Sequence, residues 1–458
     1  MEPENEARKP HCLVLPFPLQ GHVNPMLQFS KRLHHKRRAR ITLALTISFL
    51  KTAQDFPASS FPVETFSDGF DDGFDDKFGP EETYKRCWEV GSATLAQLVE
   101  KLRSSGSGVD CLIYDPFYPW ALDVAKEFGL TAAMFFTQSN SVNSIYFHAH
   151  KGELPLPLPE AEVRIPGGLP ALKPEDMPSF IRDYESDPVR SELMMKQFRN
   201  VEMVDWIFVN TFHELEQKVC DWMAKFLPVR AIGPTIPSMY IDKRLPDDRE
   251  YGISAFKPVT DPCMKWLKNQ PNKSVIYVSF GSFAQPGNEQ MEELALALKM
   301  SHMNFLWVVR ASEEAKLPQN YREVTSEKGL IVTWCNQLDV LAHEATACFV
   351  THCGWNSTLE ALSLGVPMVA LPQWSDQSAN AKFVSDVWRI GIRARPDGGG
   401  IVRNAEILRC LKHVVEGETG EEIGRSAMKW KKLAREAVDE GGSSDRNIQE
   451  FVSALMKF

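Results

Sequence analysis

Short apolar runs that lead into a polar turn and then a helical pattern recur along this chain, and this alternation constrains its fold most. The run CLVL at residues 12–15 precedes two prolines, a helical pattern and another apolar run at 41–50. The same order recurs from CLIY at residues 111–114. Strands that alternate with helices form parallel sheets, because a parallel strand must return through a crossover connection. We therefore predict an α/β fold.

The alternation stops between Pro234 and Pro258 and restarts at SVIYV, residues 274–278. A chain of 458 residues is also long for one hydrophobic core. We therefore predict two doubly wound, Rossmann-like domains that face each other across a cleft at the C-terminal ends of their strands. The predicted parts are a first domain at residues 1–240, a linker at 241–258, a second domain at 259–441 and a C-terminal helix at 442–458.

The charge and cysteine content argue against several classes of protein. The formal net charge is -9, whereas nucleic-acid binding needs a basic surface. The nine cysteines form no CxxC pair, which favours free thiols in a reducing compartment over a disulfide framework. No apolar stretch reaches the roughly 20 residues that span a bilayer, and the polar N-terminus has no signal-peptide core. We expect a cytoplasmic protein without a membrane span or a nucleic-acid partner.

Residues 334–377 predict a phosphate site. A strand-like run in this block ends at Thr351 and His352, a turn follows at Gly354, and a helical pattern begins near Asn356. The start of a helix offers unpaired backbone N–H groups and the positive end of the helix dipole. The residues alone leave three alternatives open. Trp334 could be a core aromatic residue, His352 a structural residue, and Glu360 part of a capping box that begins at Ser357.

Three pieces of this block resemble the signature of the plant family-one UDP-glycosyltransferases: HCGWNSTLEAL at 352–362, GVPM at 365–368 and DQ at 376–377. PFPLQGHVNP, at residues 16–25, resembles the catalytic loop of the same family, and the similarity extends along the whole chain. The resemblance implies the GT-B fold, in which the last helix crosses back onto the first domain. It also implies transfer of a sugar from a UDP-sugar to a small molecule.

The resemblance assigns a donor-binding role to each part of the block. Trp334 would stack on uracil, Glu360 would accept hydrogen bonds from the ribose, and His352 would contact the pyrophosphate. Asp376 and Gln377 would bind the sugar, and glutamine at this last position indicates UDP-glucose. The full set of implied donor-binding residues is Gly21, Thr137, Ser282, Trp334, Cys335, Gln337, His352, Gly354, Trp355, Asn356, Ser357, Glu360, Asp376 and Gln377.

A base must activate the acceptor hydroxyl, and histidine suits that role near neutral pH. The resemblance places His22 as this base and Asp115 as the carboxylate that orients it. Asp110 is the alternative carboxylate, but it precedes its strand and would lie at the other end of the sheet. A single displacement should invert the anomeric carbon and give a β-glucoside. Since the helix start and His352 would stabilise the leaving group, we expect no metal and no cofactor beyond the co-substrate UDP-glucose.

The acceptor is predicted only as a class: a lipophilic plant small molecule such as a steroid, triterpenoid or phenolic, joined through a hydroxyl or a carboxyl. Candidate acceptor residues are Phe135, Asn140, Met194, Met195, Phe198 and Trp374. Other functions stay possible, namely a UDP-sugar epimerase on the same fold or a nucleotide-sugar binding protein without turnover. The acidic run SDGFDDGFDD, residues 67–76, favours a solvated loop over a metal site. We expect a monomer.

Overall fold

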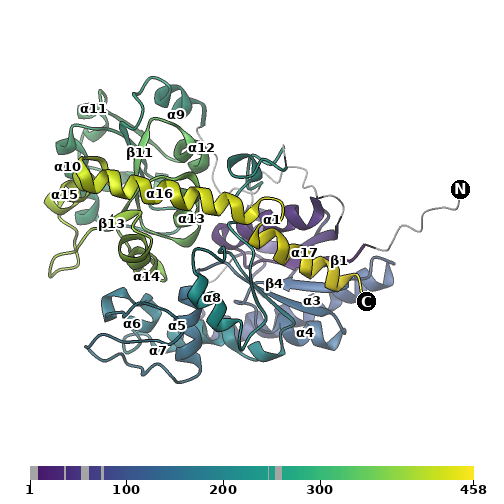
Figure 1. Ribbon diagram of the computed structural model, residues 1–458. Coiled ribbons are helices and arrows are strands. Elements are labelled where there is room, and N and C mark those ends of the chain that lie inside the picture. Colours follow the sequence, from purple (N-terminus) through teal and green to yellow (C-terminus); the bar gives the residue numbers. More distant parts are fainter. Residues whose placement is uncertain are drawn as a thin grey trace, which may run out of the picture.

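The computed structural model describes residues 9–35, 38–52, 61–73, 77–245, 247–252 and 260–457. Within these ranges the chain forms two sheets, each made of parallel strands, in two domains (Figure 1). The α/β prediction with two Rossmann-like domains is confirmed. The predicted domain boundaries at 240, 258 and 441 stay predictions.

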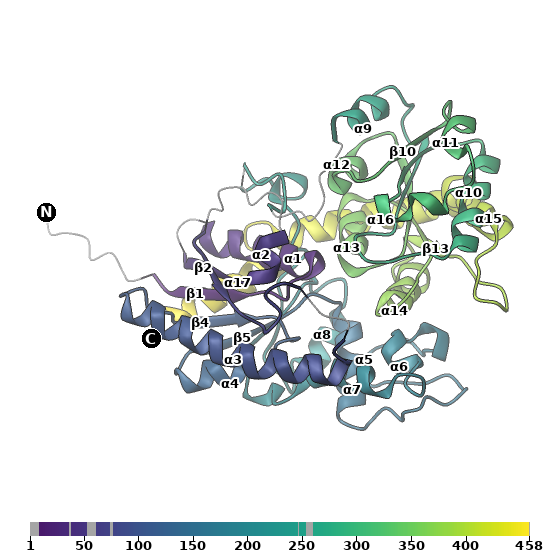
Figure 2. The same ribbon diagram turned by 180° about the vertical axis from the view of Figure 1, so that it is seen from behind.

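The first domain contains a sheet in the order β3-β2-β1-β4-β5-β6-β7. Its strands are β1 (His11–Leu15), β2 (Arg40–Thr46), β3 (Val63–Phe66), β4 (Cys111–Tyr114), β5 (Thr131–Phe136), β6 (Trp206–Val209) and β7 (Val229–Ala231). Its helices are α1 (Gln20–His34), α2 (Ile47–Thr52), α3 (Pro80–Ser104), α4 (Ala121–Glu127), α5 (Asn140–His150), α6 (Ser179–Arg182), α7 (Pro188–Met195) and α8 (Gln217–Met223). Helices α1 and α3 lie on opposite faces of this sheet (Figure 2).

The second domain contains a sheet in the order β10-β9-β8-β11-β12-β13. Its strands are β8 (Val275–Ser279), β9 (Asn304–Val308), β10 (Gly329–Val332), β11 (Thr346–Thr351), β12 (Met368–Ala370) and β13 (Gly391–Arg393). Its helices are α9 (Thr260–Leu267), α10 (Asn288–Ser301), α11 (Tyr321–Val324), α12 (Gln337–Ala342), α13 (Trp355–Leu364), α14 (Gln377–Lys382), α15 (Asn404–Val415) and α16 (Gly417–Val438). The chain ends in α17 (Ser443–Leu455).

Both faces of each sheet are covered by helices, and this explains why the strands read as continuous apolar runs. In β1, Cys12 and Val14 belong to one hydrophobic cluster, whereas Leu13 and Leu15 belong to the cluster on the opposite face. The strands of the second domain alternate in the same way. An apolar run without polar alternation therefore signals a strand that is buried on both sides.

The predicted strand at 41–50 is wrong in its second half. Strand β2 ends at Thr46, and residues 47–52 form α2. Phe49 and Leu50 pack from this helix against the cluster that contains α1. These partly buried side chains pack against the cluster from a helix, so they give the sequence the apolar character of a strand while the backbone is helical.

The C-terminal helix joins the two domains. In Figure 1, α16 and α17, drawn in yellow, run from the second domain onto the first. Ile448, Phe451 and Leu455 of α17 lie in the cluster that also contains β1 and α1. The crossing that the family resemblance implies is therefore present in the structure.

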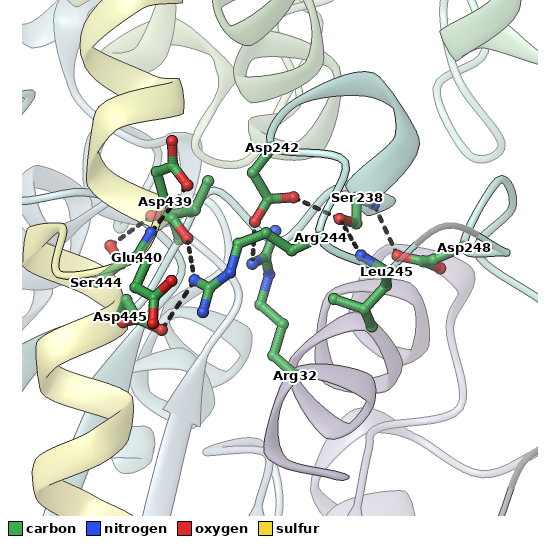
Figure 3. Close-up of polar contacts among 12 residues, drawn as sticks. Arg32, Ser238, Asp242, Arg244, Leu245, Asp248, Asp439, Glu440, Ser444 and Asp445 are labelled. Atoms are coloured by element: carbon green, nitrogen blue, oxygen red, sulfur yellow. Dashed lines mark hydrogen bonds and ion pairs between the residues drawn. The ribbon is translucent and has the colours of Figure 1, made fainter. Parts of the chain in front are cut away.

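The linker is tied to the first domain by ion pairs. Figure 3 shows Arg32 of α1 reaching Asp242, at 2.7 Å, and Arg244 reaching Asp445 of α17, at 3.0 Å. Asp242 also accepts a hydrogen bond from Ser238. Residue 246 and residues 253–259 of the linker region lie outside the described residues. Within the described ranges, no helix is both long and apolar enough to cross a membrane.

Candidate active site

His22 and Asp115 meet at the C-terminal edge of the first sheet. His22 is in the first turn of α1, and Asp115 directly follows β4, which pairs with β1. His22 Nδ1 lies 2.7 Å from Asp115 Oδ2, and Asp115 is fully buried. The other carboxylate oxygen accepts the N–H of Phe117 at 3.0 Å. Asp115 can therefore fix the imidazole so that Nε2 is the atom available to a ligand.

Thr137 and Gly21 complete this edge of the first domain. Thr137 follows β5, and its hydroxyl lies 3.2 Å from His22 Nδ1. Asp110, the alternative partner, accepts a hydrogen bond from the N–H of His11 at the opposite end of the strands. The carbonyl of Gly21 accepts a hydrogen bond from Asn356 Nδ2 at 2.8 Å. The start of α1 is thereby joined to the start of α13 in the second domain.

His352 lies between two glycines on the donor side. A Cβ at Gly281 would lie 2.9 Å from the His352 ring, and a Cβ at Gly354 only 2.5 Å from it. Burial, together with the nearby Arg310 cation, lowers the pKa of His352 to about 4. The imidazole is therefore neutral near pH 7. It can donate a hydrogen bond to a phosphate there, but it contributes no positive charge.

The start of α13 presents the remaining predicted phosphate ligands. The helix begins at Trp355 with Gly354 as its N-cap, and no side chain caps it. Backbone N–H groups at this end therefore have no intrahelical partner. Asn356 and Ser357 lie in this first turn. Glu360 is one turn further along, so the alternative of a capping box from Ser357 to Glu360 is wrong: the helix already begins before Ser357.

Glu360 is the centre of a hydrogen-bonded row. Its two oxygens accept from Tyr251 and from Gln337 Nε2, each at 2.7 Å, and Gln337 also donates to Ser357 at 2.9 Å. Burial raises the pKa of Glu360 to about 7, opposed by the hydrogen bonds from Gln337 and Tyr251. Trp334, close to Gln337 in the chain, is half-buried against the core of the second domain. A buried carboxylate beside a half-buried aromatic ring suits a ribose and a base.

The predicted sugar-binding residues do not all present their side chains in the same way. The indole of Trp355 is buried and donates to the carbonyl of Asn210 in the first domain at 2.6 Å, so only its backbone remains for a ligand. Gln377 Oε1 accepts the N–H groups of Gln373 and Trp374. Asn380 donates to Asp376 at 2.7 Å.

Asp376 interacts electrostatically with His22 of the other domain. Burial raises the pKa of Asp376 to about 6, and the Asn380 hydrogen bond and the charge of His22 oppose this shift. The thiol of Cys335, by contrast, is buried and lies 3.6 Å from the Tyr277 hydroxyl, facing the core. Only the backbone of Cys335 therefore remains available to contact a donor.

Three of the candidate acceptor residues need correction. Phe135 is fully buried and packs against Phe29 beneath α1, with ring centroids 5.3 Å apart. Phe198 is stacked on Phe136 in the core on the opposite face. Asn140 is buried, and its backbone N–H donates to Glu216. These side chains build the domain and do not line an open surface, because residues that follow a motif in sequence need not follow it into the cleft.

Trp374, by contrast, is 37% exposed. Its ring lies 5.2 Å from that of Phe283 and 5.9 Å from that of Phe180. Phe283 comes from the loop after β8, and Phe180 from α6 in the first domain. The three rings form an aromatic rim that both domains share. Met194 and Met195 are only partly buried, against the core of the first domain.

The acidic run does not form a uniformly solvated loop. Asp68 is buried and accepts the N–H of Phe70 at 3.0 Å, and burial raises the pKa of Asp68. Asp75 and Asp76 lie outside the described residues. Among the residues that are described, no group of three His, Cys, Asp or Glu side chains is placed to hold a metal ion.

Sequence reasoning missed several residues of this region. Arg310 follows β9 and donates to carbonyls of the loop after β8. Its signal was a cation directly after a buried strand. Tyr251 lies in the linker and contacts Glu360, whereas Asn380 supports Asp376 from one turn away. Neither residue has a recognisable local pattern.

Comparison with known proteins agrees with this geometry. Residues 246–429 match the family model of UDP-glucoronosyl and UDP-glucosyl transferase. The chain is 47% identical to UDP-glycosyltransferase 74B1 of Arabidopsis thaliana and 45% identical to mogroside I-E synthase of Siraitia grosvenorii. These alignments cover 98% of this chain and 98% of the first relative, and 97% of this chain and 98% of the second.

A crystal structure of Os79 from O. sativa with UDP superposes with a TM-score of 0.92 at 40% identity. The superposition covers 97% of this chain and 100% of that one. The predicted GT-B fold and the predicted enzyme class are confirmed. With likeness of this extent in sequence and in structure, the chain belongs to the plant family-one UDP-glycosyltransferases.

Proposed function

We propose that this enzyme transfers glucose from UDP-glucose to a hydroxyl of a lipophilic small molecule, with inversion, to give a β-glucoside. The observation that carries the proposal is the His22–Asp115 pair, 2.7 Å apart, at the edge that faces the start of α13. A base held by a buried carboxylate on one domain and a phosphate-binding helix start on the other are the two parts that such a transfer needs.

The reaction is a single displacement. The acceptor oxygen attacks the anomeric carbon while His22 Nε2 takes the hydroxyl proton, and Asp115 stabilises the imidazolium that forms. The bond from the anomeric carbon to the phosphate oxygen breaks, and its electron pair leaves with UDP. Because attack and departure occur on opposite faces of the sugar, an α-linked donor gives a β-linked product.

The donor contacts are assigned from the geometry of the second domain. Glu360 would accept hydrogen bonds from the ribose hydroxyls, in place of the Tyr251 hydroxyl that it binds in this structure. The N–H groups at the start of α13 and neutral His352 would stabilise the charge that grows on UDP. Asp376 and Gln377 would bind the sugar, and Gln377 supports glucose as the sugar. We propose no metal, since these groups supply the stabilisation that a metal would provide.

The aromatic rim of Phe180, Phe283 and Trp374 supports a lipophilic acceptor, because the exposed rings of Phe283 and Trp374 would gain by covering apolar surface. Relatives named for such substrates include a flavonol 7-O-beta-glucosyltransferase of Arabidopsis thaliana, and Os79 has been crystallised with a trichothecene. The 7-O linkage in the name of the flavonol enzyme favours an O-glucoside over a glucose ester. The nine cysteines are all free and eight of them are buried, which supports a reducing, cytoplasmic location.

The test is a screen of plant phenolics, steroids and triterpenoids with UDP-glucose. Mass spectrometry should detect a product heavier by one hexose, and proton NMR should assign the β configuration. His22→Ala should lower kcat by about 10²- to 10⁴-fold, while calorimetry should find UDP binding unchanged. His34→Ala, at the other end of α1, is the matched control and should leave both measurements unchanged.

An α-linked product would contradict the displacement mechanism, and a His22→Ala variant with ordinary turnover would contradict the role of His22. UDP binding without turnover on any acceptor would favour a nucleotide-sugar binding protein.

A further inference from the structure

Arg310 is placed behind the loop that follows β8, called here the β8 loop (residues 281–286). Its guanidinium is largely buried and donates through Nη1 to the carbonyl of Ser282 and through Nη2 to the carbonyl of Ala284, the latter at 2.5 Å. Bidentate donation from one planar group fixes both the position and the orientation of the two carbonyls.

A second cation extends this arrangement along the loop. Lys316 donates to the carbonyl of Pro286 at 3.0 Å and to the buried carboxylate of Glu313 at 2.5 Å. Glu313 also lies 4.0 Å from Arg310 Nη2. The buried carboxylate of Glu313 thus lies close to both Arg310 and Lys316. Together these two cations bind every second carbonyl of the loop, at residues 282, 284 and 286. This network is called the loop clamp below.

The loop clamp determines which hydrogen-bond donors the opposite side of the loop offers to a ligand. In a trans peptide the N–H points opposite to the preceding carbonyl, so the Ser282 carbonyl, held by Arg310, directs the N–H of Phe283 away from the guanidinium. Among the described residues, neither the N–H nor the hydroxyl of Ser282 has a hydrogen-bond partner. Gly281, with a φ of +69°, brings the same loop against His352. The donors that remain available therefore lie beside the phosphate-binding histidine.

The same loop also forms part of the aromatic rim. Phe283 is 59% exposed and contacts Trp374, which directly precedes the turn that carries Asp376 and Gln377. A shift of the loop would therefore move a phosphate ligand and a rim residue together.

We infer that Arg310 is a positioning residue for the transfer reaction: it holds the β8 loop so that Ser282 and the adjacent amide bind the donor pyrophosphate. This inference rests on the proposed function, because it needs the pyrophosphate beside His352. Arg310 does not touch the donor. It acts through the loop, and its charge adds to the positive potential at a site where His352 is neutral.

A purely structural role for Arg310 would lower stability without changing donor binding, and this difference makes the inference testable. Arg310→Gln removes the charge and one of the two bonds to the loop. Loss of loop contacts from a charged group that correspond to one or two hydrogen bonds should raise the Kd for UDP and the KM for UDP-glucose about 10- to 100-fold. The acceptor KM should change as well, because Phe283 moves with the loop. Arg310→Lys should be intermediate, because an ammonium lacks the fork that reaches both carbonyls.

Arg322→Gln is the matched control. Arg322, on α11, also donates to a carbonyl, that of Ile331, and to a carboxylate, that of Glu314, but neither partner belongs to the β8 loop. Its UDP affinity should stay within about twofold of the unaltered enzyme. Hydrogen exchange of the amides at 281–287 should accelerate in Arg310→Gln and not in Arg322→Gln.

A folded Arg310→Gln protein that binds UDP with unchanged affinity would overturn the inference, whatever its melting temperature. Should that variant fail to fold, Lys316→Gln releases only the Pro286 end of the clamp. Faster exchange at 281–287 with weaker UDP binding would then support the inference, and unchanged binding would refute it. Absence of UDP binding by the unaltered protein would instead refute the proposed function, and amide exchange would still report whether Arg310 holds the loop.

Discussion

Replacement of Asp115 by asparagine tests the catalytic pair with the smallest change of shape. The asparagine Oδ1 can still accept the N–H of Phe117, so the turn after β4 is retained. The amide that faces His22 Nδ1 is a donor, however, whereas the carboxylate was an acceptor. The imidazole would then carry its proton on Nε2, the atom that must accept the proton of the acceptor hydroxyl.

The expected loss of rate follows from the geometry. At the 2.7 Å separation of Nδ1 and Oδ2, Coulomb's law with an effective dielectric constant of about 20 gives about 6 kcal/mol between full charges. If the proton is about half transferred in the transition state, roughly 3 kcal/mol applies, which is about a 10²-fold effect on kcat. The unfavourable tautomer adds to this, so Asp115→Asn should lower kcat by about 10²- to 10⁴-fold.

The informative assay compares two acceptors of similar shape, an aliphatic alcohol and a nitrophenol that is already ionised in mildly alkaline buffer. An ionised acceptor needs no base, so the variant should lose much more rate with the alcohol than with the nitrophenolate. Asp110→Asn, at the opposite end of the sheet, is the control and should keep full activity. An equal loss with both acceptors would refute the assignment, because it would show that Asp115 acts on something other than proton transfer.

Two further predictions concern the donor side. Burial raises the pKa of Glu360 from its ordinary 4.5 to about 7, so between these values the folded chain binds a proton that the unfolded chain has released, and stability falls as pH rises. Glu360→Gln should therefore melt at a higher temperature than the unaltered protein at pH 8 but not at pH 5, while KM for UDP-glucose rises about tenfold or more. A gain in melting temperature of equal size at both pH values would contradict this. Gly354→Ala places a Cβ 2.5 Å from His352 and should sharply weaken UDP binding in calorimetry. Undiminished UDP binding by Gly354→Ala would contradict this, because it would show that His352 can move without cost. The control is Gly424→Ala in α16, where nothing lies within 4 Å of the added Cβ, and this variant should raise the free energy of unfolding by about 0.5–1 kcal/mol.

Much of the fold, and the gathering of the candidate site residues at the edges of the two sheets, could be predicted from the strands and the residues that follow them. The strands are apolar on both faces, and several of them are followed by polar residues such as His352 or Asp115. Since parallel strands end at the same edge of a sheet, these residues had to gather there. The main error of element type, at 47–50, arose because Phe49 and Leu50 pack on the hydrophobic cluster from a helix, and apolar character alone does not distinguish such a helix from a strand.

What sequence could not supply are contacts between segments that are far apart in the chain. Arg310 acts on Ser282 through a carbonyl, and a backbone acceptor leaves no trace in the sequence. Tyr251 contacts Glu360 across 109 positions. Phe135 and Phe198 were expected near the acceptor because of their positions in the sequence relative to the motifs, yet both side chains are fully buried in the core. Aromatic character predicts burial as readily as it predicts a binding surface.

The donor and acceptor sides therefore differ in how they are encoded. The donor side is built largely from one strand, one turn and one helix start, so its residues keep fixed spacings in the chain. The aromatic rim, which is proposed to face an acceptor, combines Phe180 of the first domain with Phe283 and Trp374 of the second. Its shape depends on how the domains are held together, through contacts such as the reciprocal hydrogen bonds between Ser179 and Ser375, both 2.8 Å. Substitutions at that contact should alter acceptor preference before they alter UDP affinity, because they move Phe180 relative to Trp374 while leaving the helix start of α13 in place.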